Sequence, residues 1–146
     1  MTDLLERCRS HMPPFMRLLG IELVSVAEDK ILARMLAREE IGNGYGALHG
    51  GAYMAFADYI GALGTILNLP KGCTTTTLES KTNFFAPAGF GQVVHGESVP
   101  LHRGRRTMAW QSRLTNADGR LLALVTQTQM VLTPNAPAPP QDPSRS

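Results

Sequence analysis

The sequence has few cysteines and little net charge, and each of these two features excludes classes of protein. Its 146 residues contain only two cysteines, Cys8 and Cys73, too few for a small secreted domain held together by disulfides. Fourteen Lys and Arg residues against twelve Asp and Glu give a net charge of +2, which argues against electrostatic capture of nucleic acid by the whole chain. The two thiols fit a reducing compartment, so we expect a cytoplasmic protein.

The sequence also lacks a secretory signal and an uninterrupted membrane span. The N-terminal residues mix acidic and basic side chains and have no apolar core that ends at small residues, as a signal peptide would. The stretch from Ala52 to Leu69 is strongly apolar, but Asp58 and several glycines interrupt it. We therefore expect a buried helix in this stretch and no contact with a membrane.

Several common catalytic signatures are missing. The four histidines are His11, His49, His95 and His102. Their spacing places no two of them on one helix face with a carboxylate, so we expect no metal ion and no cofactor. No Gly-x-Ser-x-Gly motif exists and Cys73 has no nearby partner, which leaves serine or cysteine acyl-enzyme chemistry without an anchor. A dinucleotide-binding loop at residues 42–47 is rejected, because no buried strand precedes it.

We expect residues 1–133 to form one domain and residues 134–146 to form a disordered tail. The tail holds five of the ten prolines and almost nothing that could pack. At the other end, apolar residues on both sides of Pro13 and Pro14 predict one or two short helices that break at this pair. Gly20 then ends the helical segment.

Hydrophobic patterns predict six strands and one long helix. Residues 21–37 alternate on either side of a turn at Glu28 and Asp29, which predicts a hairpin. Apolar residues then recur at helical spacing over residues 52–69, until Pro70 and Gly72 close the helix. Four further strands in meander-like succession are predicted in segments 73–89, 91–104, 105–116 and 120–132. These elements predict an antiparallel sheet with the helix on one face, which is an α+β architecture.

Asp58 is the only charged residue between His49 and Pro70. An unpaired carboxylate in so apolar a helix would cost several kcal/mol, so the presence of Asp58 needs a structural or functional reason. A helical wheel gives a bulky stripe that suits the sheet: Tyr53, Phe56, Ile60, Leu63 and Leu67. The opposite face carries Asp58 among Gly51, Met54, Ala55, Gly61, Ala62 and Thr65. Such a carboxylate suits a general base or a nucleophile, and a structural acid bonded to a hydroxyl or to Arg is the alternative.

The helix start offers a site for a negatively charged oxygen. The N–H groups of Gly50 and Gly51 have no intrahelical acceptor and lie at the positive end of the helix dipole. The eight residues from Gly50 to Asp58 separate amide and carboxylate by about 12 Å, too far for both to act on one carbonyl carbon. Two antiparallel helices related by a twofold axis would bring each carboxylate beside the other's amides. We therefore expect a homodimer with its sites at the interface.

A family resemblance rests on two motifs, NGYGALHGGAYMAFAD at residues 43–58 and TLESKTNFFAP at residues 77–87. Together they resemble the hotdog-fold acyl-CoA thioesterases of the phenylacetate-pathway type, over roughly residues 14–132. The resemblance implies a hotdog fold, an antiparallel sheet of five or six strands wrapped around one long central helix. It also implies dimers that often pair into tetramers, and hydrolysis of an acyl-CoA thioester to a free acid and coenzyme A.

The resemblance assigns roles to five residues. Asp58 matches the catalytic carboxylate, which acts as nucleophile or as general base on water, and Gly50 matches the amide that polarises the thioester carbonyl. Asn43 matches a side chain that arranges the carbonyl end of the site, and His49 matches the imidazole that orients the helix start. Thr77 falls where relatives carry Ser or Thr to position the acid or its water.

Three further residues are expected to bind substrate: Gly51, Arg105 and Arg106. Both arginines belong to the segment HRGRRT at a predicted turn between strands, where they could meet the phosphates of coenzyme A. Strand alternation places Thr75, Thr77 and Glu79 on one face, so Thr77 reaches the helix only if that face points inward.

Two other functions remain open at this stage. Hotdog folds also serve as acyl-thioester hydratases and dehydratases with a His and acid pair, although His49 and Asp58 have the thioesterase spacing. A non-catalytic acyl-CoA-binding regulator would normally need an effector domain, and the twenty residues before Ile21 are too few for a helix-turn-helix module. The sequence does not choose among aryl-acetyl, medium-chain and long-chain acyl groups.

Overall fold

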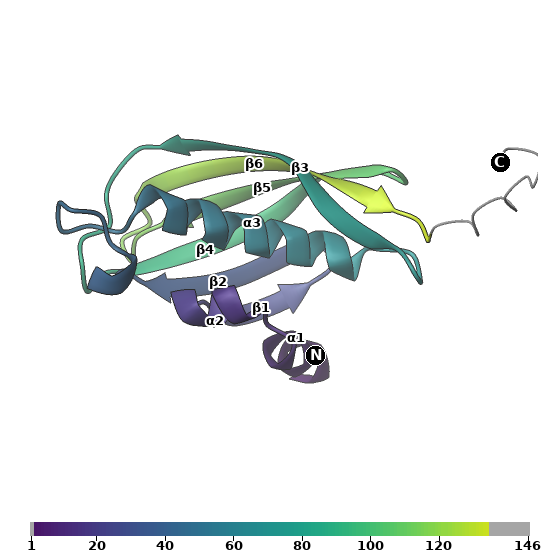
Figure 1. The fold of residues 1–146 in the computed structure, drawn as a ribbon, viewed down its shortest axis with the longest axis horizontal. Coiled ribbons are helices and arrows are strands. Elements are labelled where there is room, and N and C mark those ends of the chain that lie inside the picture. The colour runs from purple at the N-terminus through teal and green to yellow at the C-terminus, as the bar shows by residue number, and fades with distance from the viewer. Residues whose placement is uncertain (1, 135–146) are drawn as a thin grey trace, which may run out of the picture.

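The computed structural model describes residues 2–134, so the expected tail lies outside the described residues except for Pro134. Two short helices come first, and Gly20 ends the second of them in a left-handed conformation, as expected. The predicted first hairpin, long helix and four later strands are all present (Figure 1). The elements are α1 (Thr2–Ser10), α2 (Pro14–Leu19), β1 (Glu22–Ala27), β2 (Lys30–Leu36), a 3-10 turn (Glu39–Ile41), α3 (Gly50–Leu67), β3 (Thr74–Phe84), β4 (Val93–Arg103), β5 (Thr107–Thr115) and β6 (Leu121–Leu132).

The six strands form one sheet in the order β1-β2-β4-β5-β6-β3, and every neighbouring pair is antiparallel. Helix α3 lies along one face of the sheet, which curves around it (Figure 1). This is the hotdog fold. The expected meander of four strands is wrong for β3, because the chain leaves α3 at the edge of the sheet, where β3 pairs with β6 and not with β4.

The bulky stripe of α3 faces the sheet as predicted, with Phe56 and Ile60 fully buried. The small-residue face is less free than expected, because Gly61 and Thr65 are also buried. A Cβ atom added at Gly61 would lie 2.5 Å from Cδ of Gln127 on β6, and one at Gly64 would lie 2.6 Å from the Trp110 ring on β5. These two glycines therefore let α3 settle directly onto the sheet.

A β-bulge in β3 corrects the expectation that Thr75, Thr77 and Glu79 share one face. Thr77 pairs with Gln129, but the register shifts before Glu79, which pairs with Thr128. The bulge inserts one extra residue, and successive strand residues point to opposite faces. Thr77 consequently points inward with the buried Gln129, whereas Glu79 points to the outer face.

The two edges of the sheet differ. Edge strand β1 is covered by α1, whose Arg9 donates two hydrogen bonds to the carbonyl oxygen of Leu23, at 3.3 and 2.8 Å. Among the described residues, no strand lies on the outer side of edge strand β3, and Leu78 and Phe84 on this strand are exposed, as is Phe85 just after it. In the described part of the chain, no helix is both long and apolar enough to cross a membrane.

Candidate active site

Asp58 lies half-buried at the middle of α3 and is bonded to β3. The Thr77 hydroxyl donates to Oδ1 of Asp58 at 2.9 Å. Within residues 2–134, no Lys, Arg or His forms an ion pair with Asp58, and its second oxygen, Oδ2, has no hydrogen-bond donor. The carboxylate is thus held through one oxygen and free to act through the other.

A buried glutamine continues this contact into the sheet. Gln129 on β6 is fully buried, and its Nε2 donates to Thr77 Oγ1 at 2.7 Å. The Thr75 hydroxyl is shared between Gln129 Oε1, at 3.1 Å, and the carbonyl oxygen of Met130, at 2.9 Å. Because Thr77 Oγ1 accepts from Gln129, its own proton is directed at Asp58. The neighbouring Gln127 donates to the backbone oxygen of Asp58 at 3.2 Å.

The two glutamines were missed from the sequence, although a signal was present. In the run Thr126-Gln127-Thr128-Gln129 every second residue is a glutamine, in a strand whose neighbouring inward positions are apolar. Buried polar groups need hydrogen-bond partners, so this alternation marks an inward polar pair. Which groups those glutamines contact depends on the pairing of β3 with β6.

His49 caps the start of α3. Its Nδ1 accepts a hydrogen bond from the Gly51 N–H at 2.9 Å. A Cβ at Gly51 would lie 3.1 Å from that nitrogen, so glycine makes room for the cap. The Gly51 amide is therefore occupied, whereas the Gly50 N–H meets no acceptor among residues 2–134. Of the two expected amides, only that of Gly50 remains free for a substrate oxygen.

Asn43 shapes the loop that leads to this helix start. Its Oδ1 accepts from the N–H groups of Tyr45 and Ala47, at 2.8 and 3.2 Å. The loop tip projects Tyr45, which is 95% exposed. Asn43 thus acts within its own loop, at the end of the helix that carries Gly50.

One protomer does not bring the amide and the carboxylate together. Helix α3 is continuous from Gly50 to Leu67. At the rise of an α-helix, the Gly50 N–H and the Asp58 side chain are therefore separated by about 12 Å along its axis. Within residues 2–134, no cluster of three His, Cys, Asp or Glu side chains is placed to hold a metal ion.

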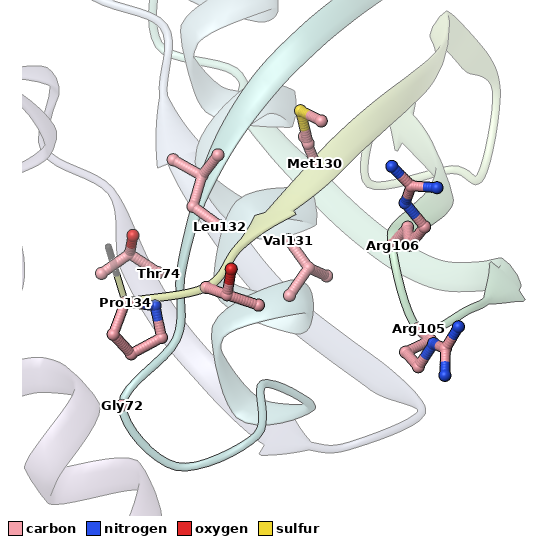
Figure 2. Close-up of a pocket in the computed structure, with 9 residues that line it drawn as sticks. Gly72, Thr74, Arg105, Arg106, Met130, Val131, Leu132 and Pro134 are labelled. Carbon is pink, nitrogen blue, oxygen red and sulfur yellow. The ribbon is translucent and has the colours of Figure 1, made fainter. Parts of the chain in front are cut away.

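Two cavities border residues that the sequence analysis expected in the site, one at Arg105 and Arg106 and the other at Asp58. A hollow of about 810 Å³ is lined by Arg105 and Arg106, which lie before β5, and by residues at the end of β6 that include Val131 (Figure 2). A groove of about 540 Å³ between α1, α2 and α3 has Asp58 in its wall. The structure therefore places the two arginines in a different cavity from Asp58. Both arginines are exposed, and neither forms an ion pair within residues 2–134.

Comparison with known proteins gives matches along most of the chain. The family model described as the thioesterase superfamily matches residues 45–123. Human acyl-coenzyme A thioesterase 13 is 34% identical over 112 residues, which are 75% of this chain and 79% of that protein. The crystal structure of a thioesterase from Haemophilus influenzae has 28% identity and a TM-score of 0.81, and covers 93% of this chain and 92% of its own.

The phenylacetate-operon protein PaaI of E. coli shares the fold at 19% identity, with a TM-score of 0.78 over 87% of this chain and 90% of that protein. The family match includes the helix with Asp58 and the whole of β3 with Thr77, and leaves out α1 and α2. The chain belongs to the thioesterase superfamily and is a thioester hydrolase of hotdog fold.

Proposed function

We propose that the protein hydrolyses acyl-CoA thioesters, with Asp58 as the catalytic carboxylate and the Gly50 N–H of a second copy as the donor to the carbonyl oxygen. The observation that carries this proposal is the hydrogen bond from Thr77 to one oxygen of Asp58, which leaves the other free in the wall of a cavity. The acyl-CoA substrate is supported by the name of the human relative.

In the proposed reaction the thioester carbonyl lies between the two groups. Asp58 Oδ2 either attacks the carbonyl carbon or takes a proton from a water that attacks it. Negative charge then develops on the carbonyl oxygen, where the Gly50 N–H stabilises it at the positive end of the helix dipole. Collapse of this intermediate breaks the C–S bond and expels the coenzyme A thiolate. In the direct route, water then hydrolyses the acyl-Asp58 anhydride; both routes yield the free acid.

Thr77 and Gln129 are positioning residues in this proposal. Gln129 directs the Thr77 proton to Asp58 Oδ1, and this bond orients the carboxylate so that Oδ2 faces the substrate. Both residues lie on strands paired along ten positions, which makes their spacing rigid. His49 and Asn43 position the other half of the site, because they hold the helix start and the loop before it.

The dimer is supported by the open edge of the sheet. Strand β3 is 11 residues long, and its free edge exposes Leu78, Phe84 and Phe85. Unpaired strand edges with apolar side chains invite pairing with another chain. A second copy related by a twofold axis at this edge would place two α3 helices on one side of a continuous sheet.

Arg105 and Arg106 are proposed to bind the phosphates of coenzyme A. Their hollow also includes Thr74, which lies three residues before Thr77 on β3, about 10 Å along the strand. A thiol leaving group near Asp58 and phosphates near the arginines would therefore lie along the same strand. Arginine suits this role because its guanidinium binds phosphate oxygens in pairs.

The direct test is release of free thiol from a panel of acyl-CoA substrates by the wild type and Asp58→Asn. A positioned acid or base contributes about 10²- to 10⁴-fold, so we expect kcat to fall by that factor. The matched control is Asp118→Asn, at an exposed turn between β5 and β6, which should leave kcat unchanged. Equal rates for wild type and Asp58→Asn would remove Asp58 from the mechanism.

A further inference from the structure

The groove that contains Asp58 is apolar over most of its surface. One wall is α3 from Asp58 to Leu67, and the opposite wall is formed by Leu4, Arg7 and Cys8 of α1 and by His11 just after it. Its polar side chains besides the Tyr59 hydroxyl and the Cys8 thiol are Arg7, His11 and Asp58. Apolar grooves with a few polar groups are typical of small-molecule sites.

Two titratable groups of the groove, the Tyr59 hydroxyl and the Cys8 thiol, have raised pKa values. Burial, with Cys8 nearby, raises the pKa of Tyr59 to about 12. Burial also raises the pKa of the Cys8 thiol, against the opposing effect of Arg7. Both groups therefore keep their protons at neutral pH and add no charge to the groove, whose lining also includes Arg7 and Asp58.

We propose that this groove binds the acyl chain of the substrate, with the thioester at Asp58 and the methyl end near Leu67. The inference rests on the proposed function, because Asp58 fixes where the thioester lies. Leu67 follows Asp58 by nine positions, so the two residues are about 14 Å apart along the helix. An extended chain advances about 1.2 Å per bond, judged from the polypeptide backbone, so the groove accommodates an unbranched acyl chain of about 10 to 12 carbons.

The family match does not include the α1 wall. It begins at residue 45, whereas α1 ends at Ser10. The catalytic half of the groove therefore lies within the residues that the family model matches, and the half that would select the acyl chain lies outside them, in the N-terminal segment. The length of the groove assigns the substrate class to a medium-chain aliphatic acyl-CoA.

The first test is a series of acyl-CoA substrates from butanoyl to hexadecanoyl, with phenylacetyl-CoA added. Each methylene buried in the groove should raise kcat/KM by up to about four-fold, until the chain fills the groove at 10 to 12 carbons. Phenylacetyl-CoA as the best substrate, or a profile that does not change with chain length, would overturn the assignment.

Two variants then block the groove from opposite walls. Ala62→Phe stands four residues from Asp58, about 6 Å along the helix, and Cys8→Phe stands on α1. Each should lower the ratio of kcat/KM for decanoyl-CoA to that for butanoyl-CoA by at least about ten-fold, since several methylenes lose their contacts. The control Val24→Phe, at an exposed position on edge strand β1, should keep the wild-type ratio. Unchanged ratios in both folded groove variants would contradict the proposal.

A second measurement does not need turnover. Alkylation of Cys8 by iodoacetamide is followed by mass spectrometry in Asp58→Asn, with decanoyl-CoA or with coenzyme A alone. We expect decanoyl-CoA to slow the alkylation of Cys8 several-fold and coenzyme A alone to leave it unchanged. No protection would overturn the groove assignment. Protection without hydrolysis by the wild type would keep the groove and instead reject the proposed hydrolysis.

Discussion

On the side of α3 that faces β3, polar groups meet in a fixed order, from Thr75 through Gln129 and Thr77 to Asp58. On the side that faces α1, the same helix borders a groove with a mostly apolar lining. The first side is built on the paired strands β3 and β6, and the second on the short helix α1. The difference separates two tasks, since rigid pairing holds the reacting group while a less constrained helix shapes the space for the substrate.

After Asp58→Asn, the largest effect should come from removal of the Gly50 amide, which has no acceptor within residues 2–134. Gly50→Pro deletes that N–H, and proline is tolerated at the first residue of a helix, after a His49 whose extended backbone suits it. Loss of an oxyanion donor should lower kcat by about 10²- to 10³-fold. Gly50→Ala keeps the N–H, and its Cβ would meet Phe84 at an ordinary 3.4 Å, so it should remain close to wild type.

Mixed dimers show whether amide and carboxylate come from different copies. Equal amounts of Gly50→Pro and Asp58→Asn, unfolded and refolded together, should regain about a quarter of the wild-type rate. Half of the dimers would be mixed, and each mixed dimer would contain one intact site out of two. A mixture as inactive as its two parents would place both groups in one chain and reject the shared site.

A smaller effect should follow from changes to the hydrogen-bond chain itself. Thr77→Val removes a hydrogen bond to a charged group, which contributes about 1.5 to 3 kcal/mol, so kcat should fall about 10- to 100-fold while Thr77→Ser retains most activity. Gln129→Glu offers an acceptor where the amide donated, and should therefore turn the Thr77 proton away from Asp58. We expect lower kcat for Gln129→Glu than for Gln129→Leu. Equal kcat in these two variants would reduce Gln129 to a packing role.

The smallest effect should come from the arginines of the separate hollow. Arg105→Gln and Arg106→Gln should each raise KM for acyl-CoA several-fold and leave kcat unchanged, because exposed charge pairs contribute about 0.2 to 1 kcal/mol. The effect should shrink at high salt. With an acyl-pantetheine substrate, which lacks the nucleotide phosphates, variants and wild type should have equal KM. A rise in KM for that substrate as well would contradict the phosphate assignment.

The sequence predicted the elements well and their arrangement less well. Helix α3 and all six strands follow from local periodicity, and Asp58 was identified because a charge in an apolar helix is costly. The position of β3 beside β6 was missed, because the pairing partner of a strand that follows a crossover is a non-local choice. The bulge at Leu78 was missed for a similar reason, since an extra residue does not disturb local composition.

The same limit applies to the candidate site. Gln129 could be flagged as an inward polar residue, but its bond to Thr77 depends on the register of two strands that are 52 residues apart at this contact. The groove was not predicted either, because the sequence fixes that α1 is a helix without fixing where it docks. In both cases the local sequence pattern identified the residue or element, but what it contacts depends on tertiary packing.

Because Gly61 and Gly64 have no Cβ atom, α3 packs close against the sheet, and this close packing sets the distance from the Asp58 carboxylate to β3. Side chains at Gly61 and Gly64 would push α3 off Gln127 and Trp110, and Asp58, three residues before Gly61 and six before Gly64, would rise with it. A lift of about 1 Å would stretch the 2.9 Å contact with Thr77 beyond hydrogen-bond length. We therefore expect alanine at Gly61 or Gly64 to lower the catalytic activity without changing any group that touches the substrate.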